Sequence, residues 1–174
     1  MFSTDLANKI LFEPLQSGMD ELSILSAYAT PNMLSWYIKN LFHKTASPIK
    51  INLIVGMVPF DNLSVSVHEG FQQIVSSDLP HEVSAVQCSY VIDKPAEHSN
   101  LFIWSRQGQP QTAFSGSANF VQSSFVGNHR RELMMQCDPA EASEYYESVI
   151  DRTAYCNHGE IEEYIILRPT HPVL

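Results

Sequence analysis

The stretch EHSNLFIWSRQGQPQTAFSGSANFVQSSFVGNHRRE, from Glu97 to Glu132, decides the fold. His98 precedes one apolar run, and Ser117 and Asn119 follow the next one. Glu132 stands just before a third run. If the three runs are neighbouring strands, these polar residues meet at one rim of a sheet, which is where ligands commonly bind in open α/β folds. The spacing therefore predicts a polar site at this rim.

Upstream of this stretch, strand and helix patterns alternate. Residues 22–29 form a short apolar run, and Thr30-Pro31 then supplies an N-cap followed by proline at the first helical position. Residues 49–57 are almost continuously β-branched or apolar, which is typical of a strand covered on both faces. We expect a further helix over residues 61–76 and a strand over residues 82–91.

Downstream, the pattern becomes β-rich. Short strands are predicted over residues 101–104, 112–115 and 132–136, with a turn at Gln107-Gly108. Asp138-Pro139 predicts the start of a helix that continues to Tyr155, and residues 161–167 are expected to form a last strand. Together these elements predict an α/β sandwich with a mixed β-sheet flanked by helices.

The motif residues resemble those of a known family. The run from His98 to Trp104, followed by Gly116-Ser117-Ala118-Asn119, is similar to the phospholipase D superfamily signature H-x-K followed by G-S-x-N. The resemblance is closest to the catalytic domain of metal-independent type II restriction endonucleases. It implies a phospholipase D-like fold over residues 1–168, and we expect residues 169–174, with their two prolines, to form a linker to a further region.

The resemblance also implies a mechanism. His98 would attack a phosphodiester and form a phosphohistidine, and a second histidine would protonate the leaving oxygen and then activate water. Ser117 and Asn119 would donate hydrogen bonds to the phosphoryl oxygens, and Glu132 would orient His98 and fix its tautomer. Such a scheme needs neither a metal nor a cofactor.

Asn100 departs from the family pattern, which has lysine two residues after the histidine. Alternation along a strand places residues 98 and 100 on the same face, so we expect the neutral Asn100 side chain to face the site. Loss of a positive charge beside a developing anion commonly costs about 10²–10³ in rate. Three interpretations follow: the chain is a weakened enzyme, a phosphate-binding protein without activity, or an enzyme with an inactivating substitution. Lys94, in the preceding loop, is a candidate to replace the missing positive charge.

The resemblance implies a dimer, because the family site needs two histidine motifs and this chain has one. His68 and His81 are followed by neither a motif lysine nor a GSxN segment. We therefore expect a homodimer in which each subunit contributes one His98. His129, His158 and His171 show no ligand spacing and are expected at the surface.

The composition limits the possible partners. A net charge of −9, with 10 basic against 19 acidic residues, opposes tight binding of nucleic acid. If DNA is the substrate, an additional recognition domain or subunit is expected to supply much of the affinity. A non-catalytic dimerisation and phosphate-binding module is the alternative. A lipid substrate is less favoured, because no amphipathic helix rich in Lys and Arg is apparent.

The remaining sequence features are those of a globular protein. Apolar residues make up 44% of the chain, enough to build a core. No apolar run reaches the ~20 residues that span a bilayer, and charges interrupt the first fifteen residues, so we expect neither a signal peptide nor a membrane partner. Three cysteines without close spacing predict no disulfide framework and favour a reducing cytoplasm.

Overall fold

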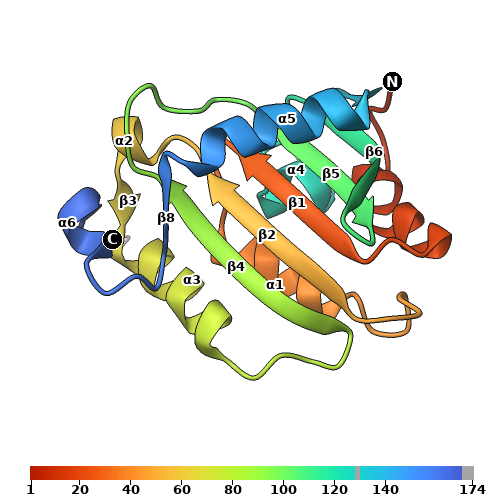
Figure 1. Cartoon of the computed structure of the whole chain (residues 1–174), viewed down its shortest axis with the longest axis horizontal. Coiled ribbons are helices and arrows are strands. Elements are labelled where there is room, and N and C mark those ends of the chain that lie inside the picture. Colours follow the sequence, from red (N-terminus) through yellow and green to blue (C-terminus); the bar gives the residue numbers. More distant parts are fainter. Residues whose placement is uncertain (128–129, 170–174) are drawn as a thin grey trace.

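A seven-stranded mixed sheet forms the centre of the molecule (Figure 1). The computed structural model describes residues 1–127 and 130–169. The strand order is β7-β6-β5-β1-β2-β4-β8. Their bounds are β1 Glu21–Ser26, β2 Ile49–Val55, β4 Val83–Val91, β5 Leu101–Arg106, β6 Gln109–Gly116, β7 Met134–Cys137 and β8 Thr153–Tyr155.

The strand directions bring chain segments from both halves of the sequence to one rim. Strands β1, β2 and β4 run parallel, whereas β5 pairs antiparallel with both β1 and β6. Strand β7 is in turn antiparallel to β6. The carboxyl ends of β1, β2, β4 and β6 therefore lie at the same rim as the amino ends of β5 and β7.

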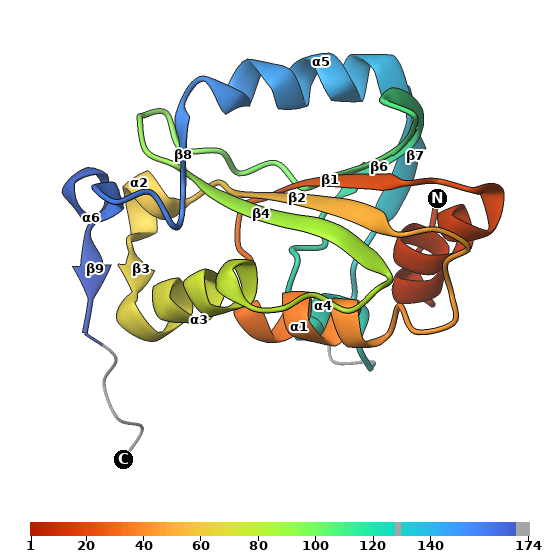
Figure 2. The ribbon, with the colours of Figure 1, turned by 60° about the horizontal axis from the view of Figure 1, so that its bottom comes forward.

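Helices cover both faces of the sheet (Figure 2). Helices α1 (Pro31–Lys39), α3 (Val65–Ser76) and α4 (Gln122–Phe125) lie on one face, and α5 (Pro139–Ile150) lies on the other. The two predicted caps are present: Thr30 accepts from the Met33 N–H, and Asp138 accepts from two N–H groups of the first turn of α5. The expected α/β sandwich with a mixed, helix-flanked sheet is confirmed.

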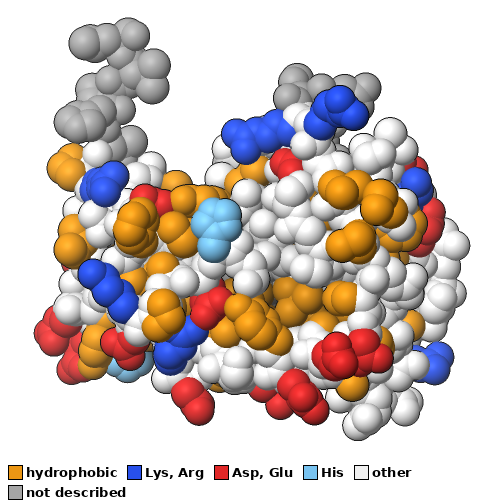
Figure 3. Space-filling model, turned by 90° about the horizontal axis from the view of Figure 1, so that it is seen from above, with side chains coloured by type: hydrophobic (Ala, Val, Ile, Leu, Met, Phe, Trp, Pro, Cys, Tyr) orange, Lys and Arg blue, Asp and Glu red, His pale blue; other side chains and the backbone are white. Residues whose placement is uncertain are grey.

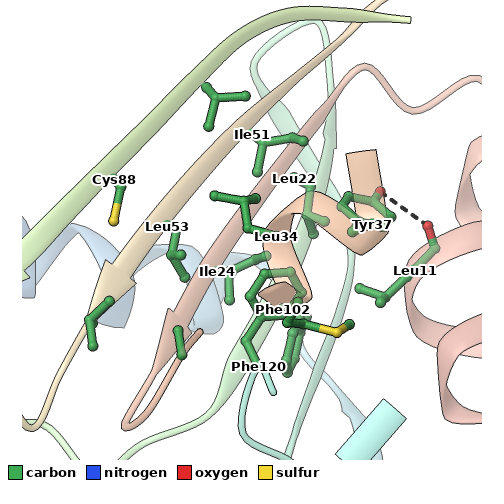
Figure 4. Packing of buried hydrophobic residues seen from close by; sticks show 14 of the residues in the cluster. Leu11, Leu22, Ile24, Leu34, Tyr37, Ile51, Leu53, Cys88, Phe102 and Phe120 are labelled. Carbon is green, nitrogen blue, oxygen red and sulfur yellow. Dashed lines mark hydrogen bonds between the residues drawn. The ribbon is translucent and has the colours of Figure 1, made fainter. Parts of the chain in front are cut away.

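The larger hydrophobic core fills the space between the sheet and α1 and α3 (Figure 4). Leu22, Ile24 and Ile51 project from the strands toward Leu34 and Tyr37 of α1, and all five are fully buried. A smaller cluster lies under α5. The near-continuous apolar character of β2 is thus explained by burial on both faces.

Two elements near the carboxyl end differ from the prediction. The helix that begins after Asp138 ends at Ile150, and Thr153–Tyr155 forms the edge strand β8, antiparallel to β4. The Ile92 N–H donates to the Arg152 carbonyl, so free hydrogen-bonding groups at the edge of β4 draw this segment away from the helix.

The strand expected over residues 161–167 is wrong. Ile161–Tyr164 is the short helix α6, and only Leu167–Arg168 is extended, as β9. Ile161 and Ile165 are both buried, and their spacing of four residues suits a helical turn rather than a strand. Strand β9 pairs with β3 (Leu63–Ser64) in a separate two-stranded sheet.

Other segments differ from the prediction in their bounds or were not predicted. The helix expected from residue 61 begins at Val65, where Ser64 is its cap, and the short helix α2 (Val58–Asp61) precedes it. The amino-terminal turns η1 (Ala7–Phe12) and η2 (Glu13–Ser17) were not expected. Residues 170–174 of the expected linker, together with His129 and His171, lie outside the described residues.

Candidate active site

The predicted site residues are carried to one rim by adjoining strand ends. His98 lies three residues before β5, Ser117 directly follows β6, and Glu132 lies two residues before β7. Backbone hydrogen bonds join these segments: the Ser117 N–H donates to the Leu133 carbonyl over 3.0 Å, and the Gly116 N–H donates to the Asn100 carbonyl over 3.3 Å. The structure therefore brings His98, Ser117, Asn119 and Glu132 to the same end of the sheet.

Two glycines allow these segments to approach one another so closely. A Cβ atom on Gly56, just after β2, would lie 2.1 Å from the Glu97 carbonyl oxygen. On Gly116, a Cβ would lie 2.1 Å from the Leu133 carbonyl oxygen. Only a residue without a side chain permits either contact, so Gly56 fixes the position of the loop that carries His98.

The His98 imidazole is exposed at the rim and makes no side-chain hydrogen bond to the described residues. Its recorded ring contact is with Tyr28, which follows β1: the ring centroids are 6.3 Å apart and the planes are 88° apart. Figure 3 shows groups of apolar side chains on the surface seen from above. An exposed imidazole that makes no side-chain hydrogen bond within residues 1–127 and 130–169 is accessible to a ligand.

Glu132 contacts two hydroxyl groups rather than His98. Its carboxylate accepts a hydrogen bond from Ser117 Oγ and another from Ser124 Oγ, the latter over 2.8 Å. Ser117 Oγ also accepts from the Leu133 N–H over 3.0 Å. Within one chain, Glu132 therefore holds the Ser117 hydroxyl, and the expected orientation of His98 by Glu132 stays a prediction.

The side-chain amide of Asn119 is fixed through its oxygen. Its side-chain oxygen accepts from the Tyr28 N–H over 3.1 Å, which fixes the orientation of the amide plane. The amide NH₂ has no hydrogen bond to the described residues, and the residue is half-buried. It is therefore a donor available to an anion, the chemistry that the motif implies for this position.

Asn100 differs from the expectation that its side chain faces the site as a free neutral donor. It is only 5% exposed. Its oxygen accepts from Ser26 Oγ over 3.0 Å and from the Ala27 N–H over 3.1 Å. Its nitrogen donates to the Gly116 and Ser117 carbonyls, both over 3.3 Å.

These hydrogen bonds join three strand ends. Ser26 and Ala27 close β1, Gly116 and Ser117 close β6, and Asn100 precedes β5 between them. An amide carries two donor hydrogens and two acceptor lone pairs, and here the protein occupies all of them. Asn100 thus joins the strands beneath the rim rather than offering a group to a ligand.

A second set of side chains, which the sequence motif did not reveal, supports the loop before β5. The nearly buried Glu97 pairs with Arg152, and Arg152 also donates to the Pro95 carbonyl over 2.6 Å. Tyr145 of α5 donates to Glu97 over 2.8 Å and lies 2.9 Å from the Ser99 hydroxyl. The residues on both sides of His98 are therefore held by α5 and the segment after it.

The charges around the rim are unevenly distributed. Arg130 and Arg131 are exposed on the segment before β7, whereas Glu141, Glu144 and Glu147 lie on α5. Figure 3 shows Lys and Arg side chains at the upper edge of this view and a group of acidic ones at its lower edge, with further charges of both signs at the left. Among the described residues, no three His, Cys, Asp or Glu side chains are grouped so that they could hold a metal ion.

The fold and the rim residues define a phospholipase D-like α/β domain. A family model for the NgoFVII restriction endonuclease N-terminal PLD domain matches residues 4–163, and the chain belongs to this family. The resemblance deduced from the motifs is thereby confirmed. A comparison with curated protein sequences found no match.

Two solved structures share the fold. Nuc, a phospholipase D family member from Salmonella typhimurium, is 12% identical with a TM-score of 0.54, over 86% of this chain and 90% of Nuc. Polyphosphate kinase from Porphyromonas gingivalis is 15% identical with a TM-score of 0.50, over 84% of this chain. The match covers only 21% of the kinase, so the chain corresponds to about a fifth of that protein. At these identities the likeness shows the fold alone.

Proposed function

We propose that this chain is the catalytic domain of a metal-independent endonuclease of restriction type that cleaves DNA. The observation that carries the proposal is the exposed His98 imidazole at the same rim as the Asn119 amide nitrogen, which has no hydrogen-bond partner among the described residues, whereas the amide oxygen accepts from the Tyr28 N–H. Both residues contact Tyr28, and phosphoryl transfer requires a nucleophile and an anion-binding donor in one site.

The proposed reaction has two balanced steps. A neutral His98 nitrogen attacks phosphorus, the P–O bond to the leaving nucleoside breaks, and a second histidine gives its proton to the departing oxygen. The same histidine then accepts a proton from water as that water attacks the phosphohistidine, which releases the phosphate monoester and frees His98. Asn119 and Ser117 donate to the phosphoryl oxygens in both steps, and the Ser117 hydroxyl must turn from Glu132 to do so.

The second histidine would be His98 of a second copy, related by a two-fold axis. Several exposed apolar side chains lie on segments at this rim and support self-association: Phe60 is 71% exposed, Tyr145 44% and Leu133 43%. Phe60 adjoins Asp61, Tyr145 contacts Ser99, and Leu133 follows Glu132, so burial of this face would also bring two rims together.

A subunit-mixing experiment tests this shared site. The parent chain and the His98→Ala variant are unfolded together and refolded as mixtures in which the fraction of the variant increases. DNA cleavage by each mixture is then measured in excess EDTA. If each site needs two copies of His98, activity falls as the square of the parent fraction. A linear fall would show that one histidine suffices in each subunit and would contradict the shared site.

One observation favours a second function. Because the protein itself occupies both polar atoms of Asn100, position 100 offers no charge and no free donor to a phosphate. The chain would then be a dimerisation and phosphate-binding module of the same fold. A folded dimer that binds a phosphodiester but cleaves no DNA, with or without lysine at position 100, would identify this alternative.

The proposal includes a separate source of DNA affinity. The net charge of −9 and the acidic helix α5 oppose binding of a duplex over most of the surface. An additional recognition domain or subunit would recognise the target sequence, and Arg130 and Arg131 would contact phosphates beside the cleavage site.

We place the protein in a reducing cytoplasm, in keeping with its three free cysteines. Within the described residues, no helix has the length and apolar character needed to cross a bilayer.

A further inference from the structure

Tyr28 contacts His98 although no motif marks it. It is the second residue after β1, and its ring meets the imidazole edge-on at a centroid distance of 6.3 Å. Aromatic pairs at this separation and angle attract one another, so the contact favours one orientation of the imidazole ring. Tyr28 can orient the imidazole only if the surrounding chain fixes the position of the Tyr28 ring.

The Tyr28 backbone is held by the same residues that form the rim. Its N–H donates to the Asn119 side-chain oxygen over 3.1 Å, and its carbonyl lies 2.8 Å from the buried Ser26 hydroxyl, whose single hydrogen it shares with the Asn100 side-chain oxygen. Ser26 Oγ also accepts from the Phe120 N–H over 2.8 Å. The backbone of Tyr28 is therefore tied to the segment that follows β6.

The Tyr28 side chain is held at its other end by Asp61. The phenol donates a hydrogen bond to the Asp61 carboxylate at the end of α2, and this bond, together with partial burial and the negative charge of Asp61, raises the Tyr28 pKa. The phenol thus stays protonated and remains a donor at neutral pH. A ring fixed at its backbone and at its hydroxyl has little freedom to move away from His98.

We propose that Tyr28 is a positioning residue for the His98 nucleophile, and that Asp61 acts through Tyr28 by fixing the ring. This inference rests on the proposed function, because it assigns Tyr28 a role in the reaction of His98. Tyr28 would touch neither the substrate nor the leaving group. It would restrict the imidazole to the orientation in which a ring nitrogen faces the phosphorus.

The kinetic test compares Tyr28→Leu, Tyr28→Phe and Asp61→Ala with the parent chain. Misplacement of a nucleophile costs rate rather than affinity, so we expect kcat for DNA cleavage to fall about 10- to 100-fold in Tyr28→Leu with KM little changed. Tyr28→Phe keeps the ring and should recover most of that loss. Asp61→Ala should resemble Tyr28→Phe, and the double variant should be no worse than either, because both remove the same hydrogen bond.

The control is another tyrosine in the same kind of contact. Tyr164 of α6 is 50% exposed and meets His158 edge-on at 6.4 Å and 68°, on a segment that carries none of the predicted site residues. Tyr164→Leu removes equal apolar surface and should leave kcat unchanged. Thermal unfolding of every variant shows whether the fold is retained.

An NMR measurement on histidine-labelled protein tests the contact without any need for activity. The His98 ring protons, assigned by their absence in His98→Ala, should show a nuclear Overhauser effect to the Tyr28 ring, and this should persist in Tyr28→Phe and vanish in Tyr28→Leu. If the parent chain shows the contact but cleaves nothing, the proposed function fails while the geometry stands. The inference is overturned if the contact is absent in the parent, or if Tyr28→Leu cleaves with an unaltered kcat or only a raised KM.

Discussion

At the scale of single residues, Asn100 shows how one substitution in a motif changes its role. Lysine at this position would carry a charge on a long chain, whereas the short amide reaches only the neighbouring strand ends. The buried amide holds the ends of β1 and β6 together and leaves no polar atom over. Asn100 therefore contributes to the rim through the geometry that it enforces.

Asn100→Ala should lower the free energy of unfolding by about 2–4 kcal/mol, because it leaves buried donors and acceptors at two strand ends without partners. Urea unfolding monitored by circular dichroism measures the change. Asn32→Ala, at an exposed position in α1, is the matched control and should stay within about 0.5 kcal/mol of the parent. A loss for Asn100→Ala no larger than that of the control would show that this network does not stabilise the fold.

His68 gives the stability a pH dependence. It is 1% exposed in α3, its Nδ1 atom lies 3.1 Å from the Tyr90 hydroxyl, and its Nε2 atom has no partner among the described residues. Burial lowers the His68 pKa below its usual 6.5, and this outweighs the opposing charges of Glu162 and Glu69. As the pH falls, the His68 imidazole therefore takes up a proton more readily in the unfolded chain than in the folded one. The contribution of neutral His68 to the free energy of unfolding is complete above about pH 6.5 and declines as the pH falls below it.

The His68→Asn variant tests this pH dependence, since its amide can still hydrogen-bond with the Tyr90 hydroxyl but does not titrate. Between pH 7.5 and pH 5.5, the parent should lose more unfolding free energy than the variant. Equal losses in the two proteins would show that His68 does not titrate differently in the folded and unfolded states.

At the scale of elements, the position of His98 depends on how closely the loop before β5 approaches the end of β2. The Glu97 N–H donates to the Gly56 carbonyl over 3.1 Å, and Arg152 and Tyr145 hold the Glu97 side chain from the other side. The loop is thus fixed by groups from β2, from α5 and from the turn before β8.

Gly56→Ala should destabilise the fold by about 1–3 kcal/mol and displace the His98 loop, because the new methyl group would meet backbone atoms that no rotamer change can move. The measurement is urea unfolding together with the cleavage rate. Gly159→Ala is the control, since a Cβ there has no heavy atom within 4 Å. Wild-type stability in Gly56→Ala would mean that the loop is not packed against β2 as the structure shows.

The sequence predicted those elements that carry strong local signals. Apolar runs located the parallel strands, and Thr30-Pro31 and Asp138-Pro139 located two helix starts. Thr153 to Tyr155 was predicted wrongly because a distant partner, the edge of β4, decides it, whereas the helix at Ile161–Tyr164 was missed although the four-residue spacing of Ile161 and Ile165 is a local helical signal. Tyr28 and Asp61 follow different strands and meet only in the folded chain, so no local pattern could reveal their pairing with His98.

At the scale of the whole molecule, one rim combines the exposed histidine, an available amide and exposed apolar side chains on a chain that is acidic overall. Such a surface suits association with a second copy better than it suits unaided binding of a duplex. We therefore propose that cleavage is a property of a dimer and that DNA affinity is supplied largely by a further domain or subunit.

The most direct test is cleavage of plasmid and single-stranded DNA in excess EDTA by the parent chain, His98→Ala and Asn100→Lys. We predict EDTA-resistant cleavage that His98→Ala abolishes and that Asn100→Lys raises, by up to about 10²–10³-fold, through the charge restored beside the phosphate. Cleavage that survives in His98→Ala, or that EDTA abolishes, would contradict a phosphohistidine mechanism at this rim.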